Sequence, residues 1–255
     1  MSLPLDPAAL PPQLCLDASD RSRGIRISLV SRAFTAEPVD CAGTLADDTP
    51  LRTLEFAVVD VETTGCSWLH GDRVTEICAV RVRGDGAIVD EYRTLVNPER
   101  PIPYEITALT NITRTMVQRA PRFCDVAADV ARALAGAVFV AHNASFDWRF
   151  VGAELERAGW PLGGRTLCTV RLARKVVPEI RSRSLDALSY FFNVHNEARH
   201  RAYGDARATA VIFRRMLDRL DTREVTRWDE LELFLLRRSQ RRKRIANPHW
   251  APDPW

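Results

Sequence analysis

The chain is organised around one stretch, Val58-Val59-Asp60-Val61-Glu62-Thr63-Thr64-Gly65. It begins apolar and ends in Thr-Thr-Gly, which predicts a buried strand and the turn that leaves it. Successive side chains of a strand alternate faces, so Asp60 and Glu62 project from the same face. Two adjacent carboxylates repel each other and raise each other's pKa unless a cation lies between them. The pair indicates either a site for a hard ion such as Mg²⁺ or Mn²⁺, or an ordinary surface carboxylate at a strand end.

Composition restricts the class of protein. The 255 residues are 46% hydrophobic, enough for one core domain with extensions or for two small domains. No apolar run reaches the ~18 residues that span a bilayer, and the N-terminus lacks the layout of a secretory signal. We therefore expect a soluble, cytoplasmic protein with no membrane partner. The six scattered cysteines form no C-x-x-C pair, which disfavours a zinc site and a disulfide framework. The net charge of +3 implies a weak overall field.

Three segments are expected along the chain. Residues 1–50 form an N-terminal extension, partly ordered, with one strand-like alternation at 25–30. This extension either packs on the main domain or a partner, or is a disordered leader. Residues 51–220 form the core domain. Residues 221–255 form a basic C-terminal helix, expected over 228–244, followed by a tail without regular structure.

The core domain reads as strands followed by alternating helices and strands. Strands are expected at 55–60, 74–83, 87–96, 137–141 and 166–169, with Gly84-Asp85-Gly86 as a hairpin turn. Helices are expected at 104–109, 113–119, 123–134, 170–176, 185–192 and 203–220. One more helix is expected directly after residues 142–147, ending at about residue 158. This order predicts an α/β fold with a mixed sheet of five strands and helices on both faces.

Three short pieces of sequence carry candidate chemistry. They are Asp60-x-Glu62, Asp147 at the end of His142-Asn143-Ala144-Ser145-Phe146-Asp147, and His200 with Asp205. Sites in open α/β sheets form beyond the carboxyl ends of strands, where the first two pieces lie. Four converging carboxylates require cations, and two divalent metals can serve phosphodiester hydrolysis. A histidine that titrates near neutrality suits the role of base.

These pieces resemble the three motifs of the DEDDh exonucleases, the family of the proofreading epsilon subunit of bacterial DNA polymerase III and of ribonuclease T. Asp60 and Glu62 match the first motif, Asp147 the second, and His200 with Asp205 the third, with the spacing of five that the family shows. The resemblance covers residues 51–220. Each motif alone is weak, whereas all three in order are specific.

The resemblance implies a ribonuclease H-like exonuclease fold and 3′-to-5′ hydrolysis that releases nucleoside 5′-monophosphates. It implies two Mg²⁺ or Mn²⁺ ions, with Asp60, Glu62 and Asp205 on one ion and Asp60 bridging to the second. Asp147 would support the site, and His200 would be the general base. The implied substrate is a nucleic-acid 3′ end, with single-stranded DNA expected first.

The resemblance also implies four substrate contacts. The backbone of Thr63 and the side chain of Thr64 would lie against the terminal nucleotide. Asn143 would order its loop, and Phe146 could stack on a base. Ribonuclease T-like members have an aromatic residue after the first-motif glycine, where this chain has Cys66. The same terminal-base stack is therefore not implied here.

Several other residues favour ordinary roles. His195 is expected to be a loop histidine, and His142 to be structural. The basic run at 237–244 is either a solvated helix end or a contact to a nucleic-acid backbone. The tail with Trp250 and Trp255 is either a peptide that docks on a partner or an unstructured end.

Two alternatives to a DNA exonuclease stay open at this point. An exoribonuclease that trims RNA 3′ ends would share every motif, because the two substrates differ by contacts to the 2′-hydroxyl. A non-catalytic module that binds a polymerase or another protein through its extensions would share the fold. The intact set of carboxylates argues against this module, because a binding domain has no physical reason to keep groups that repel one another.

Overall fold

The structure is a computed structural model that describes residues 38–196 and 198–237. The strand expected at 25–30, the basic run after Arg237 and the tail with Trp250 and Trp255 lie outside these residues. Among the described helices, none is long and apolar enough to cross a membrane.

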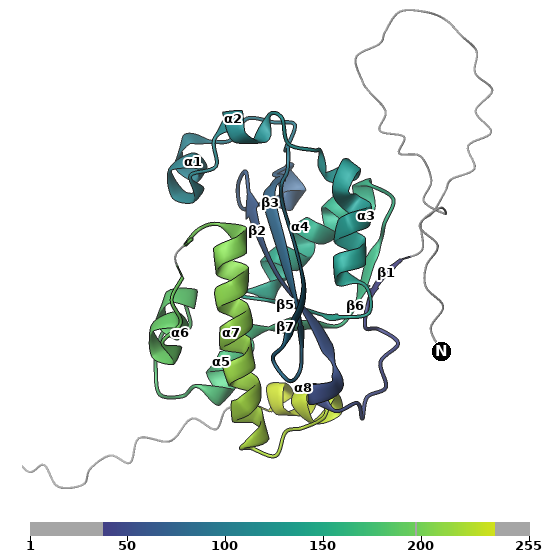
Figure 1. The fold of residues 1–255 in the computed structure, drawn as a ribbon, viewed down its shortest axis with the longest axis vertical. Coiled ribbons are helices and arrows are strands. Elements are labelled where there is room, and N and C mark those ends of the chain that lie inside the picture. The colour runs from purple at the N-terminus through teal and green to yellow at the C-terminus, as the bar shows by residue number, and fades with distance from the viewer. Residues whose placement is uncertain (1–37, 197, 238–255) are drawn as a thin grey trace, which may run out of the picture.

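A mixed sheet of five strands forms the centre of the fold, as the sequence predicts. Its strands are β2 (Glu55–Thr63), β3 (Val74–Arg83), β4 (Ile88–Leu95), β5 (Val138–Ala141) and β7 (Thr166–Cys168). Their order is β4-β3-β2-β5-β7 (Figure 1). The first three make an antiparallel meander, and β5 and β7 continue the sheet parallel to β2. The carboxyl ends of β2, β5 and β7 therefore meet at one edge of the sheet.

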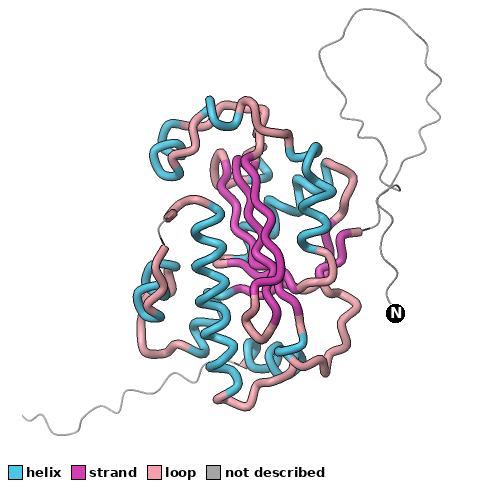
Figure 2. Tube along the Cα trace, viewed as in Figure 1, coloured by secondary structure: helices cyan, strands magenta, loops and turns pink. Residues whose placement is uncertain are grey.

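Helices cover both faces of this sheet (Figure 2). Their bounds are α1 Tyr104–Thr110, α2 Arg114–Val117, α3 Phe123–Leu134, α4 Ala144–Arg157, α5 Thr169–Val176, α6 Leu185–Phe192, α7 Ala202–Asp221 and α8 Trp228–Leu236. Short 3₁₀ turns lie at Leu51–Thr53 and Trp68–His70. Thr113 caps the start of α2 by accepting a hydrogen bond from the Met116 amide, a role that threonine often has.

The alternation of β2 divides the core into two layers. Phe56 and Val58 pack with α5, α6, α7 and α8, and the rings of Phe56 and Phe213 meet at 4.8 Å. Ala57 and Val59 pack on the other side with α3 and α4. Asp60 and Glu62 continue the first of these two faces, so they point toward the side that α7 covers. The same pattern that buries the strand thus aims both carboxylates.

The structure adds a second, smaller sheet that the sequence did not predict. Strand β1 (Val39–Cys41) pairs in parallel with β6 (Leu162–Gly164). Strands of three residues are too short for an alternating pattern to register. At Gly164, φ is +109° and a Cβ would lie 2.4 Å from the Cys41 carbonyl oxygen, so this pairing requires glycine.

The segments that flank the expected core domain are joined to each other. The amide of Leu51 donates to the Thr226 carbonyl at 2.7 Å, and the amide of Trp228 donates to the Thr49 carbonyl at 3.0 Å. Trp228 is buried, so α8 closes one end of the core. The helix that the sequence predicted over 228–244 ends, within the described residues, at Leu236, because Arg237 already leaves the helical conformation.

A buried ion pair connects β3 to α4. The Arg73 guanidinium binds Glu154 with Nε–Oε1 and Nη2–Oε2 distances of 2.6 and 2.9 Å, and the Glu154 side chain is only 2% exposed. The Val74 amide also donates to Glu154. The pair holds the start of β3 against the helix that carries Asp147.

Replacing Arg73 by leucine is expected to lower the free energy of unfolding by about 3 kcal/mol, because it leaves a buried carboxylate without its main partner. The double variant Arg73→Leu/Glu154→Leu should recover most of this loss. Urea denaturation followed by circular dichroism measures both. Arg132→Leu, which removes an exposed pair with Asp129, is the control and should cost less than about 0.5 kcal/mol. Equal losses in Arg73→Leu and the control would contradict the assignment.

Candidate active site

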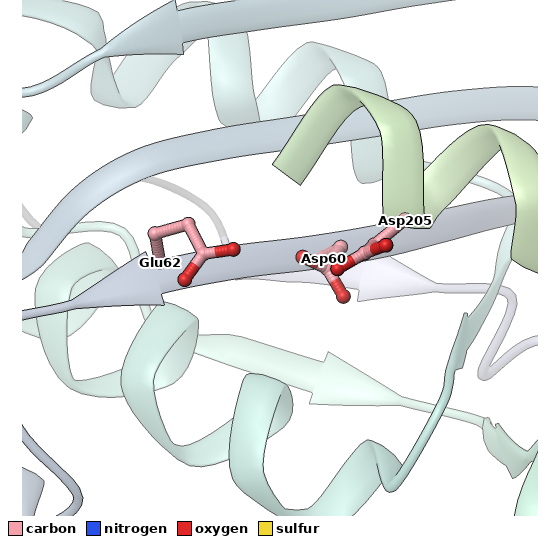
Figure 3. A group of neighbouring side chains, drawn as sticks. All are labelled: Asp60, Glu62 and Asp205. Carbon is pink, nitrogen blue, oxygen red and sulfur yellow. The ribbon is translucent and has the colours of Figure 1, made fainter. Parts of the chain in front are cut away.

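Three carboxylates from distant parts of the chain converge at the end of β2. Asp60 and Glu62 extend from this strand, and Asp205 extends from the first turn of α7 (Figure 3). One oxygen from each side chain lies within 4.8 Å of the others. The structure therefore brings together three of the four predicted carboxylates as one group.

Asp147 supports this group from behind β2. Its side chain is buried, and its Oδ1 atom accepts a hydrogen bond from the Val61 amide at 3.2 Å. Val61 lies between Asp60 and Glu62, so Asp147 fixes the strand where both carboxylates leave it. It is not one of the three residues whose oxygens lie within 4.8 Å of one another.

The turn before α7 holds Asp205 through both oxygens. The Asn196 side-chain amide donates to Oδ1 at 2.5 Å, and the His200 backbone amide donates to Oδ2 at 3.1 Å. His200 has φ +57°, a left-handed conformation that is uncommon for residues other than glycine. The backbone of His200 thus reverses direction just before α7 and binds Asp205, its partner in the third motif.

Burial raises the pKa of the two carboxyls on β2. For Asp60 the pKa is raised well above its usual value, first by burial and then by the charges of Asp147, Asp205 and Glu62. For Glu62, burial and then the charges of Asp205 and Glu76 raise the pKa to about 8. The pair therefore keeps protons near neutral pH unless another positive charge is present.

The pKa values of the two carboxyls on helices, Asp147 and Asp205, are raised as well. Burial raises the pKa of Asp147 to about 7, against the opposing effect of backbone hydrogen bonds that include the one from Val61. Burial also raises the pKa of Asp205, against the opposing hydrogen bonds from Asn196 and His200. A proton or a cation stabilises all four groups in the same way.

A divalent ion fits this donor set. Oxygens on opposite sides of Mg²⁺ are separated by about 4.2 Å, twice the usual metal–oxygen distance, and larger hard cations accept wider spacings. The 4.8 Å limit observed for Asp60, Glu62 and Asp205 is close to this span. The three donors are carboxylate oxygens, which suit hard cations rather than soft ones. These residues could therefore hold a divalent metal.

Sequence reasoning missed two residues beside the group, Glu76 and Arg201. Glu76 is directly opposite Glu62 in the β2–β3 register and is buried. Arg201 binds it with Nη2–Oε1 and Nε–Oε2 distances of 2.7 and 2.9 Å, and the Ala202 amide also donates to it at 3.0 Å. The sequence did contain a signal for this pair. Glu76 lies on the apolar side of the strand expected at 74–83, and a buried charge requires a partner.

This ion pair has two consequences for the group. It neutralises a fifth carboxylate that would otherwise compete for the same cation. It also joins β3 to the residue that precedes α7, and so fixes the point from which Asp205 extends. Arg201 is adjacent to His200 in the chain, so the pair anchors the turn that carries both residues of the third motif.

The two threonines predicted to contact substrate are engaged in the turn after β2. Both are buried. The Thr63 hydroxyl donates to the Gly65 carbonyl at 2.5 Å. The Thr64 hydroxyl donates to Asp72 at 3.1 Å and accepts from the Arg73 amide at 3.1 Å. Their side chains thus order this turn, and a contact to substrate stays a prediction.

The two predicted substrate residues on α4 are partly accessible. Asn143 is exposed, has φ +75°, and begins α4 without a side-chain capping bond. Its left-handed backbone explains why asparagine suits this position. Phe146 is half-buried, and its ring lies 4.8 Å from that of Phe150. One side of Phe146 is therefore packed, and its contact with substrate stays a prediction.

The other histidines occupy separate places. His195 is exposed in the loop before α7. His142 is half-buried, and its Nδ1 atom lies 2.9 Å from the Thr169 hydroxyl, a contact that joins β5 to α5. This contact agrees with the structural role expected for His142.

Comparison with known sequences identifies relatives of the chain. Residues 57–213 match the RNase T family, described as Exonuclease. A Mycobacterium tuberculosis protein provisionally named as a bifunctional exonuclease/endonuclease is 40% identical over 227 residues, covering 85% of this chain and 35% of the relative. A DNA polymerase III subunit epsilon-like protein of Rhodobacter capsulatus is 41% identical over 182 residues, covering 70% and 26%. The chain spans about a third or less of the length of these relatives.

Comparison with solved structures supports the same fold. Exonuclease X in complex with 5′-overhanging duplex DNA is 30% identical with a TM-score of 0.55, covering 71% of this chain and 99% of that one. Exonuclease I of E. coli with a dT13 oligonucleotide has a TM-score of 0.59 at 16% identity, covering 68% and 43%. The second likeness shows the fold alone.

Glu62→Gln is expected to stabilise the metal-free protein at pH 8. The pKa of Glu62 is higher in the folded chain than in the unfolded chain, so the folded state binds more protons, and stability falls as pH rises from about 4.5 to about 8. The variant lacks this penalty. In chelator, the melting temperature of Glu62→Gln should exceed that of the wild type by at least about 2 °C at pH 8, with a smaller difference at pH 5.

Addition of Mn²⁺ in the same experiment should reverse the order at pH 8, because the ion stabilises only a folded site with its full charge. Glu156→Gln, a substitution of a carboxylate outside the group, is the matched control. A gain for Glu62→Gln that is independent of pH would refute the electrostatic explanation.

Proposed function

Because the chain belongs to the RNase T exonuclease family, we propose that it is a metal-dependent 3′–5′ exonuclease that releases nucleoside 5′-monophosphates. The observation that carries this proposal is the convergence of Asp60, Glu62 and Asp205, with oxygens within 4.8 Å of one another. The family match at residues 57–213 includes all three, together with Asp147 and His200. Phosphodiester hydrolysis uses such a set of carboxylates to hold divalent ions.

Asp60, Glu62 and Asp205 would hold one Mg²⁺ or Mn²⁺ ion, and Asp60 with support from Asp147 would hold the second. Such ions, when bound, lower the pKa of water and stabilise negative charge on the attacking and leaving oxygens. Asp147 keeps the backbone between Asp60 and Glu62 in place through its bond to Val61. The rigid strand therefore sets the spacing of the ligands.

His200 would accept the proton of the attacking water. It lies in the turn that precedes α7, five residues before Asp205, and its own amide binds that carboxylate. As the proton leaves, the water oxygen forms a bond to phosphorus and the bond from phosphorus to the 3′ oxygen breaks. The Arg201–Glu76 pair would position His200, because it anchors the adjacent residue without occupying the imidazole.

DNA is the substrate that the relatives favour. One relative is named as an epsilon-like subunit of DNA polymerase III, another as the 3′–5′ exonuclease DinG of Bacillus subtilis, and the solved Exonuclease X structure contains DNA. We propose single-stranded 3′ ends of DNA, with Thr64, Asn143 and Phe146 beside the terminal nucleotide. The relatives favour neither an exoribonuclease nor a non-catalytic module. Because one relative is named as a DNA polymerase III of the PolC type, a polymerase is a candidate partner for the segments that flank the core.

Asp60→Asn is expected to abolish hydrolysis and leave the fold intact, because it removes a ligand shared by both proposed ions. The assay uses 5′-labelled single-stranded DNA and RNA of the same sequence, with Mg²⁺, with Mn²⁺ and with chelator. The wild type should give a metal-dependent ladder that shortens from the 3′ end. Retained cleavage in Asp60→Asn with an unchanged melting temperature would remove the proposed site.

His200→Ala is expected to lower kcat by about 10²-fold or more, as removal of a general base does. The loss should lie in kcat rather than in KM, because His200 is not proposed to bind substrate. His195→Ala, which removes an exposed histidine of the same loop, is the matched control and should retain activity. Wild-type turnover in His200→Ala would transfer the base to another residue.

A further inference from the structure

A groove lined by three arginines opens at the end of the sheet that carries the metal group, and these arginines have no role in the proposed chemistry. Its volume is about 420 Å³, and its lining includes Arg149, Arg171, Arg174, Asn143, Ser145 and Trp148. None of the residues that line it is acidic. Arg149 extends from α4, whereas Arg171 and Arg174 extend from α5, so the positive charges stand on two separate helices.

The three arginines are not used by the described part of the protein. All three are exposed, and none makes a hydrogen bond or an ion pair with another described residue. Some exposed arginines elsewhere have acidic partners, as Arg199 has Asp186 and Arg207 has Glu91. Three unpaired guanidinium groups on one groove repel one another, and an anion would relieve this repulsion. Guanidinium groups bind phosphate with two parallel hydrogen bonds.

The groove opens at the same end of the sheet as the carboxylates, beyond the carboxyl ends of the parallel strands. Cys168 and Ala141 are paired at the ends of β7 and β5, and β5 is the neighbour of β2. Two strand spacings separate β7 from β2, roughly 10 Å. Asp147 and Arg149 extend from the first turns of the same helix, α4, with Asp147 buried against β2 and Arg149 exposed on the groove. The negative group and the positive groove therefore open at the same end of the sheet.

Helix direction adds to the attraction for anions. The N-termini of α4 and α5 both open on the groove, since Asn143, Ala144 and Cys168 contribute to its lining. Unpaired amides at helix starts favour negative charge. Trp148 is held edge-on against Phe139 at 5.1 Å, which gives the groove a fixed aromatic wall. Such walls accept sugars or bases without sequence preference.

We propose that this arginine groove binds the sugar-phosphate backbone of the single strand whose 3′ end occupies the metal group. The inference rests on the proposed function, because that function makes the ligand a nucleic acid. Phosphates next to the scissile bond would lie on Arg149, Arg171 and Arg174, while the terminal phosphodiester lies at Asp60, Glu62 and Asp205. The groove then holds the strand between successive cleavages.

The test is binding of 5′-fluorescein-labelled single-stranded DNA in chelator, where hydrolysis cannot proceed, followed by fluorescence anisotropy at several salt concentrations. Arg171→Gln/Arg174→Gln should raise Kd at least about tenfold and reduce the slope of log K against log salt by about 1.4, since each phosphate contact on a single strand contributes about 0.7. Arg214→Gln/Arg215→Gln removes the same charge from an exposed face of α7 and is the matched control. Equal losses in both double variants, or an unchanged slope in the first, would overturn the groove.

A small substrate separates the groove from the proposed function. The p-nitrophenyl ester of thymidine 5′-monophosphate has a phosphodiester bond but no neighbouring nucleotides. With Mn²⁺, Arg171→Gln/Arg174→Gln should lose kcat/KM on the oligonucleotide and not on this ester. If the wild type hydrolyses neither substrate, the exonuclease proposal fails, and the binding result still decides the groove. Melting temperatures equal to that of the wild type confirm that the variants are folded.

Discussion

Repulsion among buried and half-buried carboxylates is the constraint on which the rest of this structure depends. Asp60, Glu62, Asp147 and Asp205 are brought to one end of a sheet by segments far apart in the sequence, and burial makes each of them resist ionisation. A fold can keep such groups together only if packing elsewhere outweighs their cost. The two apolar layers on either side of β2 provide that packing, and β2 itself supplies two of the four groups.

The protein treats its buried acids in two different ways. Glu76 and Glu154 each receive a guanidinium group, from Arg201 and Arg73, together with a backbone amide. These pairs connect β3 to α7 and to α4. The carboxylates at the end of β2 have no such guanidinium bond within the described residues. The acids that are paired with arginine thus hold strands and helices together, whereas the acids at the end of β2 are available to a cation.

Much of this arrangement could be predicted from the sequence because its signals are local. An apolar run identified β2, alternation identified β3, the Gly84-Asp85-Gly86 turn identified the hairpin, and the order of strands and helices identified the fold class. The pairing of β1 with β6 could not be predicted, since three residues carry no period and the partner lies far along the chain. The Arg201–Glu76 pair was missed for a similar reason: register, which no single segment records, places Glu76 opposite Glu62. The sequence shows that the site carboxylates exist. Only the folded structure shows that Arg201 and Arg73 bind Glu76 and Glu154 rather than these carboxylates.

The length of α7 sets the distance between the carboxylates and the far end of the described fold. Its 20 residues span about 30 Å from Ala202 to Asp221, with Asp205 in the first turn, and α8 follows at the far end. Arg237 therefore leaves the described fold on the side away from the carboxylates. The backbone pairing of Thr49 and Leu51 with Trp228 and Thr226 holds α8 at this far end. The described chain therefore closes its apolar core at one end of α7 and gathers its carboxylates at the other.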